Sequence, residues 1–559
     1  MGLIQNTFAF GIGFNLSNGG ATVINSTIGS FVLGRLYFKP PWPSAVVWVP
    51  ALVVSAAVLL PPVYLIIRAA SDGSSAVDAI FRLRILEIMG RTLLLVGAVS
   101  TGSVILAVPL AWLTVRTDLP FRRIWAVLTA LPLVIPSYVG GFIVVLVLGP
   151  RGMLQGLLES IFGIDRLPDI SGFPGAMLTL TLLSYPYVLL TVRAGLLRMD
   201  PALEESSRGL GQNAWSTFFR VILRQLRPAI AAGSLLAALY TLSDFGAVSL
   251  LRYETFTWAI FVQYGSALDR TLGAAMSLVL VGLALSMVVG EVFTRGGARY
   301  YVSGSSVSRP SAEIKLGRWV WPALVFCGIV VSAALFLPMS ILGYWVFRGV
   351  SAGEPLLFQW DAARNSLLVS AVAAVATVVV ALPVAVMSVR YLGLFSIVLE
   401  RVTYIGFALP GISIALGLVF FGVNYAPPLY QTTGMLIFAY VVLFLSPAVG
   451  AARTSLLQVS PRMEEAARGL GKTPLKVFTT VTLPLVLPGI LSGAALVFLL
   501  TMKELPATLI LSPIGFTTLA TSIWAAASEA FFARAAAPAL LLILASSVPL
   551  GFLMLRERR

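Results

Sequence analysis

The sequence predicts an all-α polytopic membrane protein with about 12 transmembrane helices in two homologous six-helix halves. Hydrophobic residues make up 58% of the 559 residues and charged residues only 11%, whereas soluble domains hold about 25% charged residues. The apolar runs are long and do not alternate in polarity, which favours helices over the strands of a membrane barrel. A stretch of the first half also recurs in the second half.

The expected spans follow from length, because a bilayer core of about 30 Å needs roughly 20 apolar residues per helix. The first half is expected to cross the membrane near residues 47–67, 92–115, 124–147, 173–196, 229–251 and 271–293. The second half is expected to cross near residues 320–345, 365–389, 399–422, 431–455, 487–511 and 537–555. Prolines inside these spans predict kinks, at Pro109, Pro383, Pro136 and Pro410.

Four segments organise the chain. Residues 1–46 carry no charge before Arg35 and lack the basic start of a signal peptide, so a poorly structured or surface-lying leader is expected. The first half occupies 47–293 and the second half 319–559. The linker between them, 294–318, is polar and rich in Gly and Ser, which indicates a flexible connection.

The distribution of basic residues predicts the orientation. With both termini in the cytoplasm, the inner segments hold 26 of the 38 Lys and Arg residues and the outer segments hold 11. Cytoplasmic loops of membrane proteins carry such an excess. The bias therefore predicts a multi-pass protein with both termini in the cytoplasm, and it explains the net charge of +15 without a nucleic-acid partner.

An internal repeat relates the two halves. Residues 204–233 and 464–493 share 12 identical positions in 30, at an offset of 260. Upstream, Arg116 matches Arg390 at an offset of 274, so an insertion of 14 residues is expected, and the outer segment 148–172 is its expected place. Six spans per half give both halves the same orientation, which implies a pseudo-two-fold axis along the membrane normal with a pathway on it.

Several chemistries are excluded by residue content. The chain has no histidine, so it cannot form a His-containing catalytic triad or a His metal site. The single cysteine, Cys327, lies in an apolar run and is expected to be a small buried hydrophobe. Gly471-Lys472-Thr473 imitates the end of a phosphate-binding loop but lacks the glycine five residues earlier, where Ala466 stands. No stably bound cofactor is therefore expected.

The repeated segment is a cytoplasmic loop of about 30 residues that is expected to dock a partner. Its carboxylates fall on the first turn of a short helix, where the helix dipole favours them, and its glycines then let the backbone turn. The expected docking residues in the first copy are Glu204, Glu205, Arg208, Gly209 and Gly211. In the second copy they are Glu464, Glu465, Ala466, Ala467, Arg468, Gly469 and Gly471.

This loop resembles the EAA motif of permease subunits in binding-protein-dependent ABC importers. The second copy fits closely, with Glu465-Ala466-Ala467, Gly471 and then Val481-Thr482-Leu483-Pro484. The first copy departs from the motif, with Ser206-Ser207 for Ala-Ala and Arg224 for the proline, so unequal docking is expected. The resemblance implies a place in a bacterial inner membrane, with two ABC ATPase subunits that would hydrolyse ATP on the cytoplasmic side and a periplasmic substrate-binding protein on the outer side.

The resemblance covers roughly residues 45–559 and extends to a narrower group. Two fused halves, with Thr241–Val248 and Lys503–Thr508, look like the ferric-iron permeases of that superfamily. The same architecture is similar to fused thiamine or phosphonate permeases, which leaves those substrates open. The implied function is translocation of ferric iron by a non-enzymatic subunit.

Asp244 and Glu504 are the candidate pathway residues, because they align at the offset of 260 and lie in the fifth span of each half. Charges within a span are costly and usually functional, and hard oxygen ligands suit Fe³⁺ as a transiently bound metal. The alternative is a structural role, for instance a pair between Glu504 and Lys503. The tyrosines of the apolar spans are expected to be packing residues: Tyr138, Tyr185 and Tyr240.

Two other classes of function remain open from the sequence. A secondary transporter of two six-span halves would need no repeated docking loop. A membrane-embedded enzyme would need a convergent set of catalytic groups, and the spans offer only two acids and one lysine.

Overall fold

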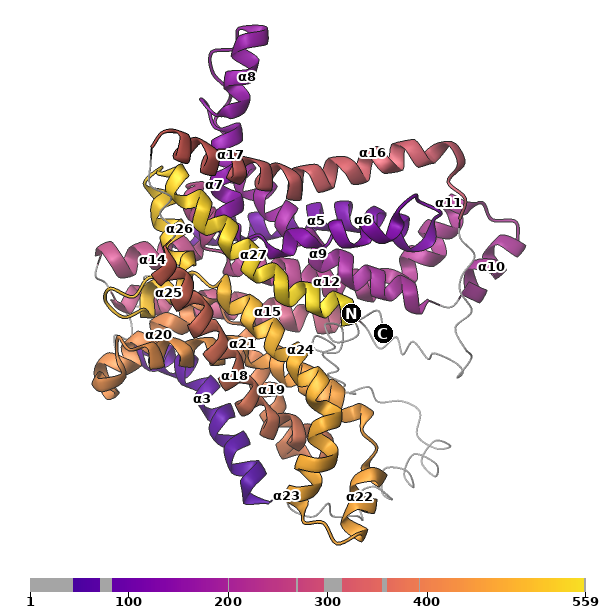
Figure 1. The fold of residues 1–559 in the computed structure, drawn as a ribbon, viewed down its shortest axis with the longest axis vertical. Helices are drawn as coiled ribbons and strands as arrows, with labels where there is room; N and C mark the ends of the chain where they lie inside the picture. The colour runs from indigo at the N-terminus through magenta and orange to yellow at the C-terminus, as the bar shows by residue number, and fades with distance from the viewer. Residues whose placement is uncertain are drawn as a thin grey trace.

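The computed structural model describes residues 44–70, 83–199, 201–267, 270–295, 314–353, 359–391 and 393–556. Within these ranges the chain is almost entirely helical (Figure 1), and the predicted all-α class is confirmed. The expected leader lies outside the described residues except for 44–46, and so does most of the expected linker.

Within the described residues, the first half forms twelve α-helices. They are α3 (Ala45–Ala70), α5 (Leu83–Arg116), α6 (Arg122–Leu128), α7 (Ser137–Leu148), α8 (Met153–Phe162), α9 (Phe173–Arg198), α10 (Pro201–Gly209), α11 (Ala214–Thr217), α12 (Leu223–Ser243), α13 (Gly246–Leu250), α14 (Phe256–Val262) and α15 (Arg270–Arg295). A 3₁₀ turn, Leu131–Val134, stands between α6 and α7, and π-helical turns at Phe218–Ile222 and Gln263–Ala267 adjoin α12 and α14.

The second half repeats this order. Its helices are α16 (Val320–Val331), α17 (Leu337–Ser351), α18 (Trp360–Arg390), α19 (Leu394–Ala408), α20 (Gly411–Tyr425), α21 (Thr433–Gln458), α22 (Pro461–Gly469), α23 (Pro474–Val477), α24 (Leu483–Met502), α25 (Pro506–Leu511), α26 (Leu519–Ser528) and α27 (Phe532–Arg556). Short turns at Gly317–Trp319, Ser332–Phe336, Pro427–Leu429 and Phe478–Thr482 complete it.

The number of membrane spans agrees with the expectation of about twelve. Among the described residues, 11 helices are long and apolar enough to cross a bilayer, and 12 if the bent pair of α19 and α20 counts as one span. Pro109 and Pro383 lie inside the continuous helices α5 and α18.

The third span of each half is broken rather than merely kinked. Helices α19 and α20 meet at 105°, and Pro410 precedes α20 in an extended conformation. Pro136 holds the same position before α7. Proline cannot donate a helical hydrogen bond and pushes the residue before it out of the helix, so the single helices expected at 124–147 and 399–422 are each two helices.

The fifth span of each half is also broken, which the sequence reading missed. Helix α12 ends at Ser243 and α13 begins at Gly246, while α24 ends at Met502 and α25 begins at Pro506. Asp244 takes an extended backbone conformation at the first break. Both candidate pathway acids therefore stand at helix ends and not inside continuous helices.

The first helix of each half packs against the opposite half. Helix α3 contacts α18, α19 and α20 of the second half, and its Ala51 and Val58 lie in a core cluster of that half. In return, Ala323 and Cys327 of α16 lie in a cluster formed mainly by α5, α9 and α12 of the first half. Cys327 is buried as expected. This exchange ties the halves together through apolar surface.

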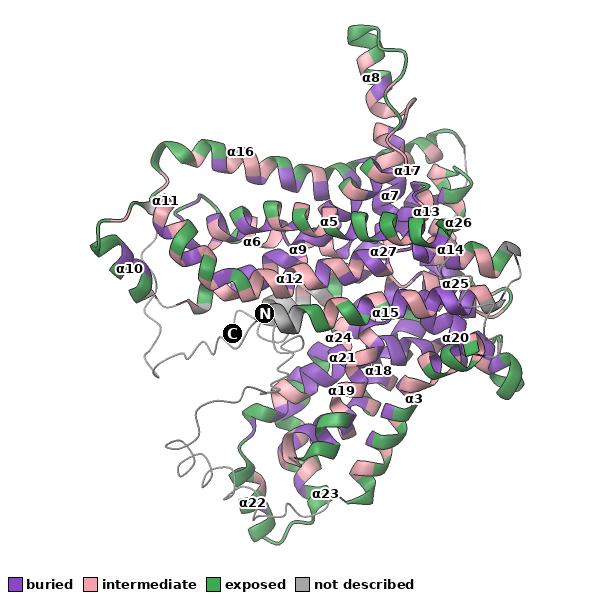
Figure 2. Cartoon of the chain, turned by 180° about the vertical axis from the view of Figure 1, so that it is seen from behind, coloured by how far each residue is buried: buried purple, intermediate pink, exposed green. Residues whose placement is uncertain are grey.

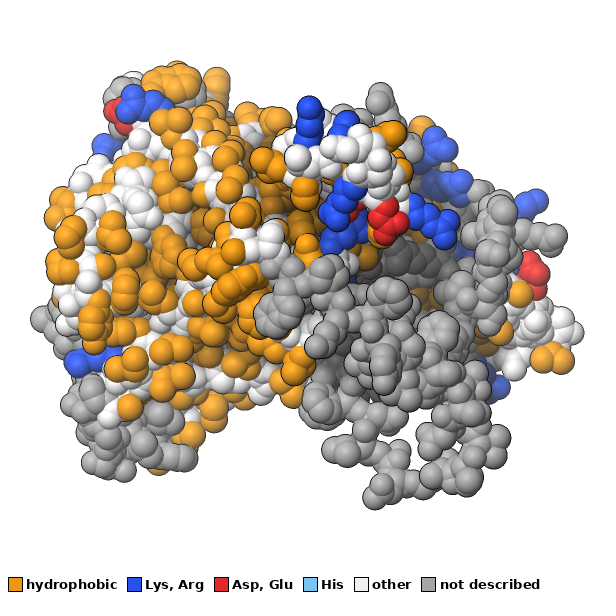
Figure 3. Space-filling view, turned by 90° about the horizontal axis from the view of Figure 1, so that it is seen from below, with side chains coloured by type: hydrophobic (Ala, Val, Ile, Leu, Met, Phe, Trp, Pro, Cys, Tyr) orange, Lys and Arg blue, Asp and Glu red, His pale blue; other side chains and the backbone are white. Residues whose placement is uncertain are grey.

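Burial is greatest in the central helices, of which α21 is buried along most of its length (Figure 2). A wide hydrophobic surface covers the left part of the face in Figure 3, while Lys, Arg, Asp and Glu gather mainly toward the right, the side of α10 and α22 in Figure 1. Such an apolar band is what a bilayer would cover.

The 14-residue difference between the halves falls where it was expected. Helices α7 and α9 are joined by residues 149–172, whereas α20 and α21 are joined by residues 426–432. The longer connection carries α8, which projects beyond the rest of the molecule (Figure 1).

Candidate coupling loops and translocation pathway

The two repeated loops, called the coupling loops from here on, have the same backbone conformation. Helices α10 and α22 each end in a turn, closed by the Gly211 amide donating to the Arg208 carbonyl and by the Gly471 amide donating to the Arg468 carbonyl, both at 2.9 Å. Gly211 has φ +82 and Gly471 has φ +81. This left-handed conformation is easy for glycine and costly for other residues, which explains why glycine stands at both positions.

The first glutamate of each loop faces inward, onto the transmembrane domain. Glu204 forms an ion pair with Arg116 of α5, whose side chain is only 2% exposed, and a second one with Arg208 at 3.0 Å. Glu464 pairs with Arg390 of α18 at 2.8 Å. Thr482 also donates to Glu464, at 3.0 Å. Each pair anchors a short helix to the second span of its half.

The departure of the first copy from the motif is compensated within the loop. The Ser207 and Thr217 hydroxyl groups are buried and hydrogen-bonded to each other at 3.0 Å. At the equivalent positions the second copy has Ala467 and Val477, both buried. A polar pair in one copy thus replaces an apolar pair in the other, and both loops keep the same fold.

Except for Ala467, which is buried, the remaining expected loop residues are exposed: Glu205, Arg208, Gly209 and Gly211 in one copy and Glu465, Ala466, Arg468, Gly469 and Gly471 in the other. Leu210 and Leu470, at equivalent positions, are each 83% exposed. Large exposed apolar side chains at such tips favour contact with a partner protein.

The two pathway candidates cap the short helices that follow the breaks. The Asp244 Oδ1 atom accepts the amide hydrogens of Ala247 at 3.0 Å and Val248 at 3.3 Å. Glu504 Oε1 accepts the Ala507 amide hydrogen at 3.2 Å. A carboxylate in this position satisfies amides that have no helical partner. Both acids therefore have a structural role as well as any role in transport.

The expected alternative pair between Glu504 and Lys503 does not appear among the described ion pairs. The Lys503 ammonium instead donates to the Leu133 carbonyl, in the third span of the first half, at 2.7 Å. Lys503 thus connects the fifth span of one half to the broken third span of the other.

Close backbone approach brings the broken third and fifth spans together within each half. A Cβ added at Gly411 would lie 2.5 Å from Glu504 Oε1, and one added at Gly246 would lie 2.8 Å from the Tyr138 Cβ atom. A side chain at either place would force the Glu504 carboxylate or the Tyr138 side chain to shift, so glycine allows the two spans to approach this closely. The breaks of the two spans are consequently neighbours, at the level where the candidate acids lie.

A resident metal site is not formed by the residues that the structure describes, because no three His, Cys, Asp or Glu side chains come together in them. The expected packing role of the tyrosines agrees with their positions. Tyr138 and Tyr185 are buried in apolar clusters, and Tyr240 is partly buried against a third cluster. Transient contact of Asp244 or Glu504 with a substrate stays a prediction.

Comparison with known families decides the class of the protein. The family of binding-protein-dependent transport system inner membrane components matches residues 103–352 and 377–559. The chain belongs to this family. The resemblance seen in the loop motif is thereby confirmed, and the family is one of membrane transport components.

Several relatives of this permease carry ferric-transport names. It is 37% identical to the Fe(3+)-transport system permease protein FbpB 2 of Haemophilus influenzae, over 88% of this chain and 95% of that protein. It is 26% identical to the ferric transport system permease protein FbpB of Actinobacillus pleuropneumoniae, over 76% and 65%. The molybdenum transport system permease protein ModB of Escherichia coli is 30% identical, over 35% and 90%.

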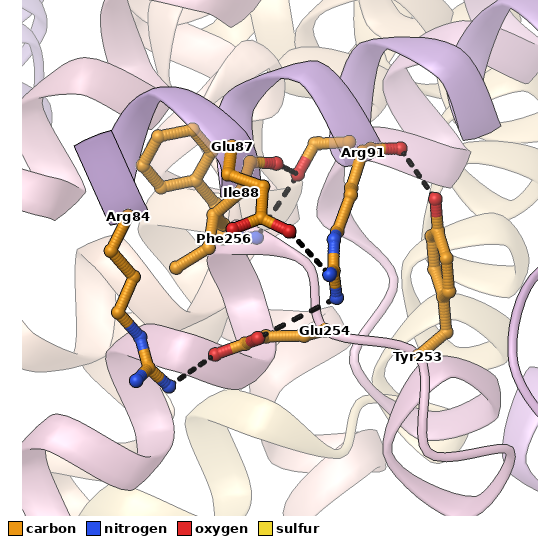
Figure 4. A network of polar contacts seen from close by, with 8 residues as sticks. Arg84, Glu87, Ile88, Arg91, Tyr253, Glu254 and Phe256 are labelled. Atoms are coloured by element: carbon orange, nitrogen blue, oxygen red, sulfur yellow. Dashed lines mark hydrogen bonds and ion pairs between the residues drawn. The ribbon is translucent and has the colours of Figure 1, made fainter.

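At the end opposite the coupling loops, a polar network fastens the permease's loop after α13 to the start of α5 (Figure 4). Glu254 pairs with Arg84 at 2.9 Å and with Arg91 at 3.7 Å. The Tyr253 hydroxyl donates to the Arg91 carbonyl at 3.0 Å, and burial raises the pKa of Tyr253, which keeps this donor protonated. The network holds the re-entrant chain after Asp244 in place.

Arg116 and Arg390 are the functional residues that the sequence reading noted only as a match in register. The sequence did contain a sign of these pairs, because Arg116 and Arg390 match at an offset of 274 and their partners Glu204 and Glu464 match at an offset of 260. The sequence alone does not show that the arginine and the glutamate of each half meet. Only the fold places them together.

Proposed function

We propose that this permease is the translocation subunit of an ATP-driven importer that carries ferric iron across a bacterial inner membrane. The observation that carries the proposal is the pair of loops with the same backbone, each anchored to its own half by an ion pair that is buried in the first half and partly buried in the second. The ferric substrate is supported by the relatives named for Fe(3+) transport, which match most of the chain.

Two ATPase subunits would dock on the exposed faces of α10 and α22. The exposed leucines at the two loop tips, Leu210 and Leu470, offer each subunit an apolar side chain to enclose. The permease itself would bind no cofactor stably, and ATP would be bound and hydrolysed by the docked subunits. A soluble binding protein would deliver iron at the opposite end.

The loop architecture suggests how movement of the ATPase subunits would reach the pathway. The chain connects α10 and α22 to the fourth and fifth spans of their halves, and the ion pair connects each of them to the second span. Displacement of α10 or α22 would therefore move three spans of its half together. ATP binding and hydrolysis would shift the balance between two openings of the pathway by stabilising one arrangement over the other.

The orientation is part of the proposal. Both termini and both coupling loops would lie in the cytoplasm, because that assignment puts 26 Lys and Arg residues inside and 11 outside. The charge distribution in Figure 3 agrees with it, since charged side chains gather toward the coupling-loop side.

Iron would pass the level of the two broken spans, where Asp244 and Glu504 lie. Carboxylate oxygens are suitable ligands for a hard cation, and the two acids come from equivalent positions of the two halves. They would contact iron transiently in transit and would not hold it as a resident metal.

Reconstitution tests the proposal directly. The permease would be co-expressed with a candidate ATPase and a candidate binding protein from the same organism, purified as a complex and placed in proteoliposomes. We expect ATP-dependent uptake of radioactive ferric iron that needs the binding protein and is not competed by molybdate, sulfate, thiamine or phosphonate. Uptake driven by an ion gradient without ATP would contradict the importer, whereas ATP-dependent uptake of a different solute alone would contradict only the iron assignment.

A further inference from the structure

Helix α8 is the clearest difference between the two halves. It occupies the connection 149–172 of the first half, and the equivalent connection of the second half, 426–432, contains only a short turn. Figures 1 and 2 show α8 projecting from the rest of the molecule, with exposed residues along it. The helix lies at the end of α7 away from α10 and α22.

The helix has one apolar side and one polar side. At 100° per residue, Leu154, Leu157, Leu158 and Ile161 fall on one side. Their exposure is high for apolar residues, with Leu157 62% exposed and Ile161 69% exposed. Soluble proteins rarely leave such a continuous apolar face uncovered.

The polar side is already occupied by the protein's own chain. Gln155 donates from Nε2 to Glu159 at 2.8 Å and to the carbonyls of Ile164 and Asp165 at 3.1 and 3.0 Å. The Leu167 amide donates to the Pro150 carbonyl at 3.1 Å. The returning segment therefore folds along the polar side and leaves the apolar face pointing outward.

Helix α7 does not continue the direction of the helix before the break. In the second half α19 and α20 meet at 105°, and α7 is the counterpart of α20 in the first half. By the repeat, α7 and the helix α8 that follows it turn away from the direction of the long spans, as Figure 1 shows for α8.

The neighbours of α8 on α17 indicate its depth in the membrane. Met153, the first residue of α8, packs against the same cluster as Trp345 of α17. The Arg348 guanidinium lies over the Trp345 ring at 5.0 Å. Tryptophan and arginine at the end of a span are typical of the membrane–water interface.

We propose that α8 is an interfacial anchor that lies in the leaflet opposite the coupling loops, with Leu157 and Ile161 in the acyl region of the lipid. In Figure 1 α8 stands upright, beyond α16, whereas α5, α9 and α16 run from side to side, so α8 extends along the membrane surface when those helices cross the bilayer. The exposed charges of the returning segment, Asp165 and Arg166, then face water. The anchor fixes the depth of α7 in the first half alone.

Site-directed spin labelling of the full permease tests this arrangement. In a Cys327→Ala background, single labels would be introduced by Leu157→Cys and Ile161→Cys on the apolar face and by Ser160→Cys and Asp165→Cys as controls. The protein would be placed in nanodiscs of phosphatidylethanolamine and phosphatidylglycerol. Relaxation by oxygen, which concentrates in lipid, would be compared with relaxation by a nickel chelate, which stays in water.

We expect the oxygen-to-nickel ratio at positions 157 and 161 to exceed that at 160 and 165 several-fold. Equal nickel access at all four positions would overturn the proposal. Labels at 157 and 161 that are accessible to nickel until the binding protein is added would also overturn it, because α8 would then be a protein-docking helix. Two independent apolar positions keep the test valid if one variant fails to fold.

Discussion

Arg390 of α18 donates to Glu464 of α22 at 2.8 Å, and Arg116 of α5 pairs with Glu204 of α10 at the equivalent positions of the first half. The partners are separated by 74 residues in one half and by 88 in the other. Each pair joins a transmembrane helix to a loop helix. The first glutamate of each loop is therefore an anchor, and the second, exposed glutamate is the one available to a partner.

Glu204→Ala should loosen α10 and reduce ATP-dependent uptake. It leaves the Arg116 guanidinium, 2% exposed, with an unpaired charge, and breaking a buried pair costs about 3–5 kcal/mol. Glu464→Ala should have a smaller effect, because the Arg390 and Glu464 side chains are 16% and 14% exposed. Hydrogen exchange over residues 201–217 and 461–477 measures the loosening.

The control for this prediction is the exposed neighbour in each loop. Glu205→Ala and Glu465→Ala should leave exchange of the loop amides unchanged, even if they weaken ATPase binding. Unaltered exchange over 201–217 in Glu204→Ala would mean that the ion pair does not hold α10.

The glycine turns give a prediction with a control two residues away. Gly211→Ala and Gly471→Ala should each destabilise their loop by about 1–2 kcal/mol, the cost of a left-handed backbone for a residue with a Cβ atom. Gly209→Ala and Gly469→Ala should be tolerated, since their backbones are not left-handed and an added Cβ meets nothing within 4 Å. Limited proteolysis of the loops would reveal the difference, and equal cleavage of all four variants would contradict it.

The hydrogen-bonded pair in the first loop predicts non-additive substitutions. Ser207→Ala alone should destabilise α10 by about 1–3 kcal/mol, because it leaves the buried Thr217 hydroxyl without its partner. Combining it with Thr217→Val should recover most of that loss, since the second loop already uses Ala467 and Val477 at these positions. Thermal unfolding of the single and double variants checks the prediction, and strictly additive losses would refute it.

The sequence was sufficient for the class, the number of spans, the repeat and the loop, because those features depend on composition and local pattern. The breaks at Asp244 and Glu504 were not predicted, since apolar residues continue on both sides of them and hydropathy cannot distinguish a broken span from a continuous one. The exchange of α3 and α16 between halves was also missed. The apolar residues of α3 and α16 show that these helices must be covered by other apolar surface. They do not show which half of the protein covers each helix.

Close approach at the second break predicts a sensitive glycine. Gly411→Ala should impair folding or transport, because the added Cβ would lie 2.5 Å from Glu504 Oε1 and must displace the carboxylate that caps α25. Gly282→Ala in α15 is the matched control, since an added Cβ there meets nothing within 4 Å. The yield of monodisperse protein and the uptake rate should fall for Gly411→Ala only. Normal values for both variants would show that the capping arrangement at Glu504 tolerates displacement.

Neutral substitutions at the two acids separate their capping role from a role in transport. In Asp244→Asn and Glu504→Gln the amide oxygen can still accept the backbone hydrogens that the carboxylate accepts, so the fold and the assembly with the ATPase should be preserved. If the negative charge assists a trivalent cation, each variant should slow iron uptake, and the double variant should be slower than either. Binding of iron by the separate binding protein should not change.

Asp244→Ala completes this experiment, because it removes the acceptor as well as the charge. We expect it to lose both assembly and uptake, since the Ala247 and Val248 amides would have no partner within the membrane. Assembly and uptake must therefore be measured side by side in all four variants. Full uptake by a well-assembled double variant, together with failure of Asp244→Ala, would assign the two acids to the architecture of the broken spans and not to the iron pathway.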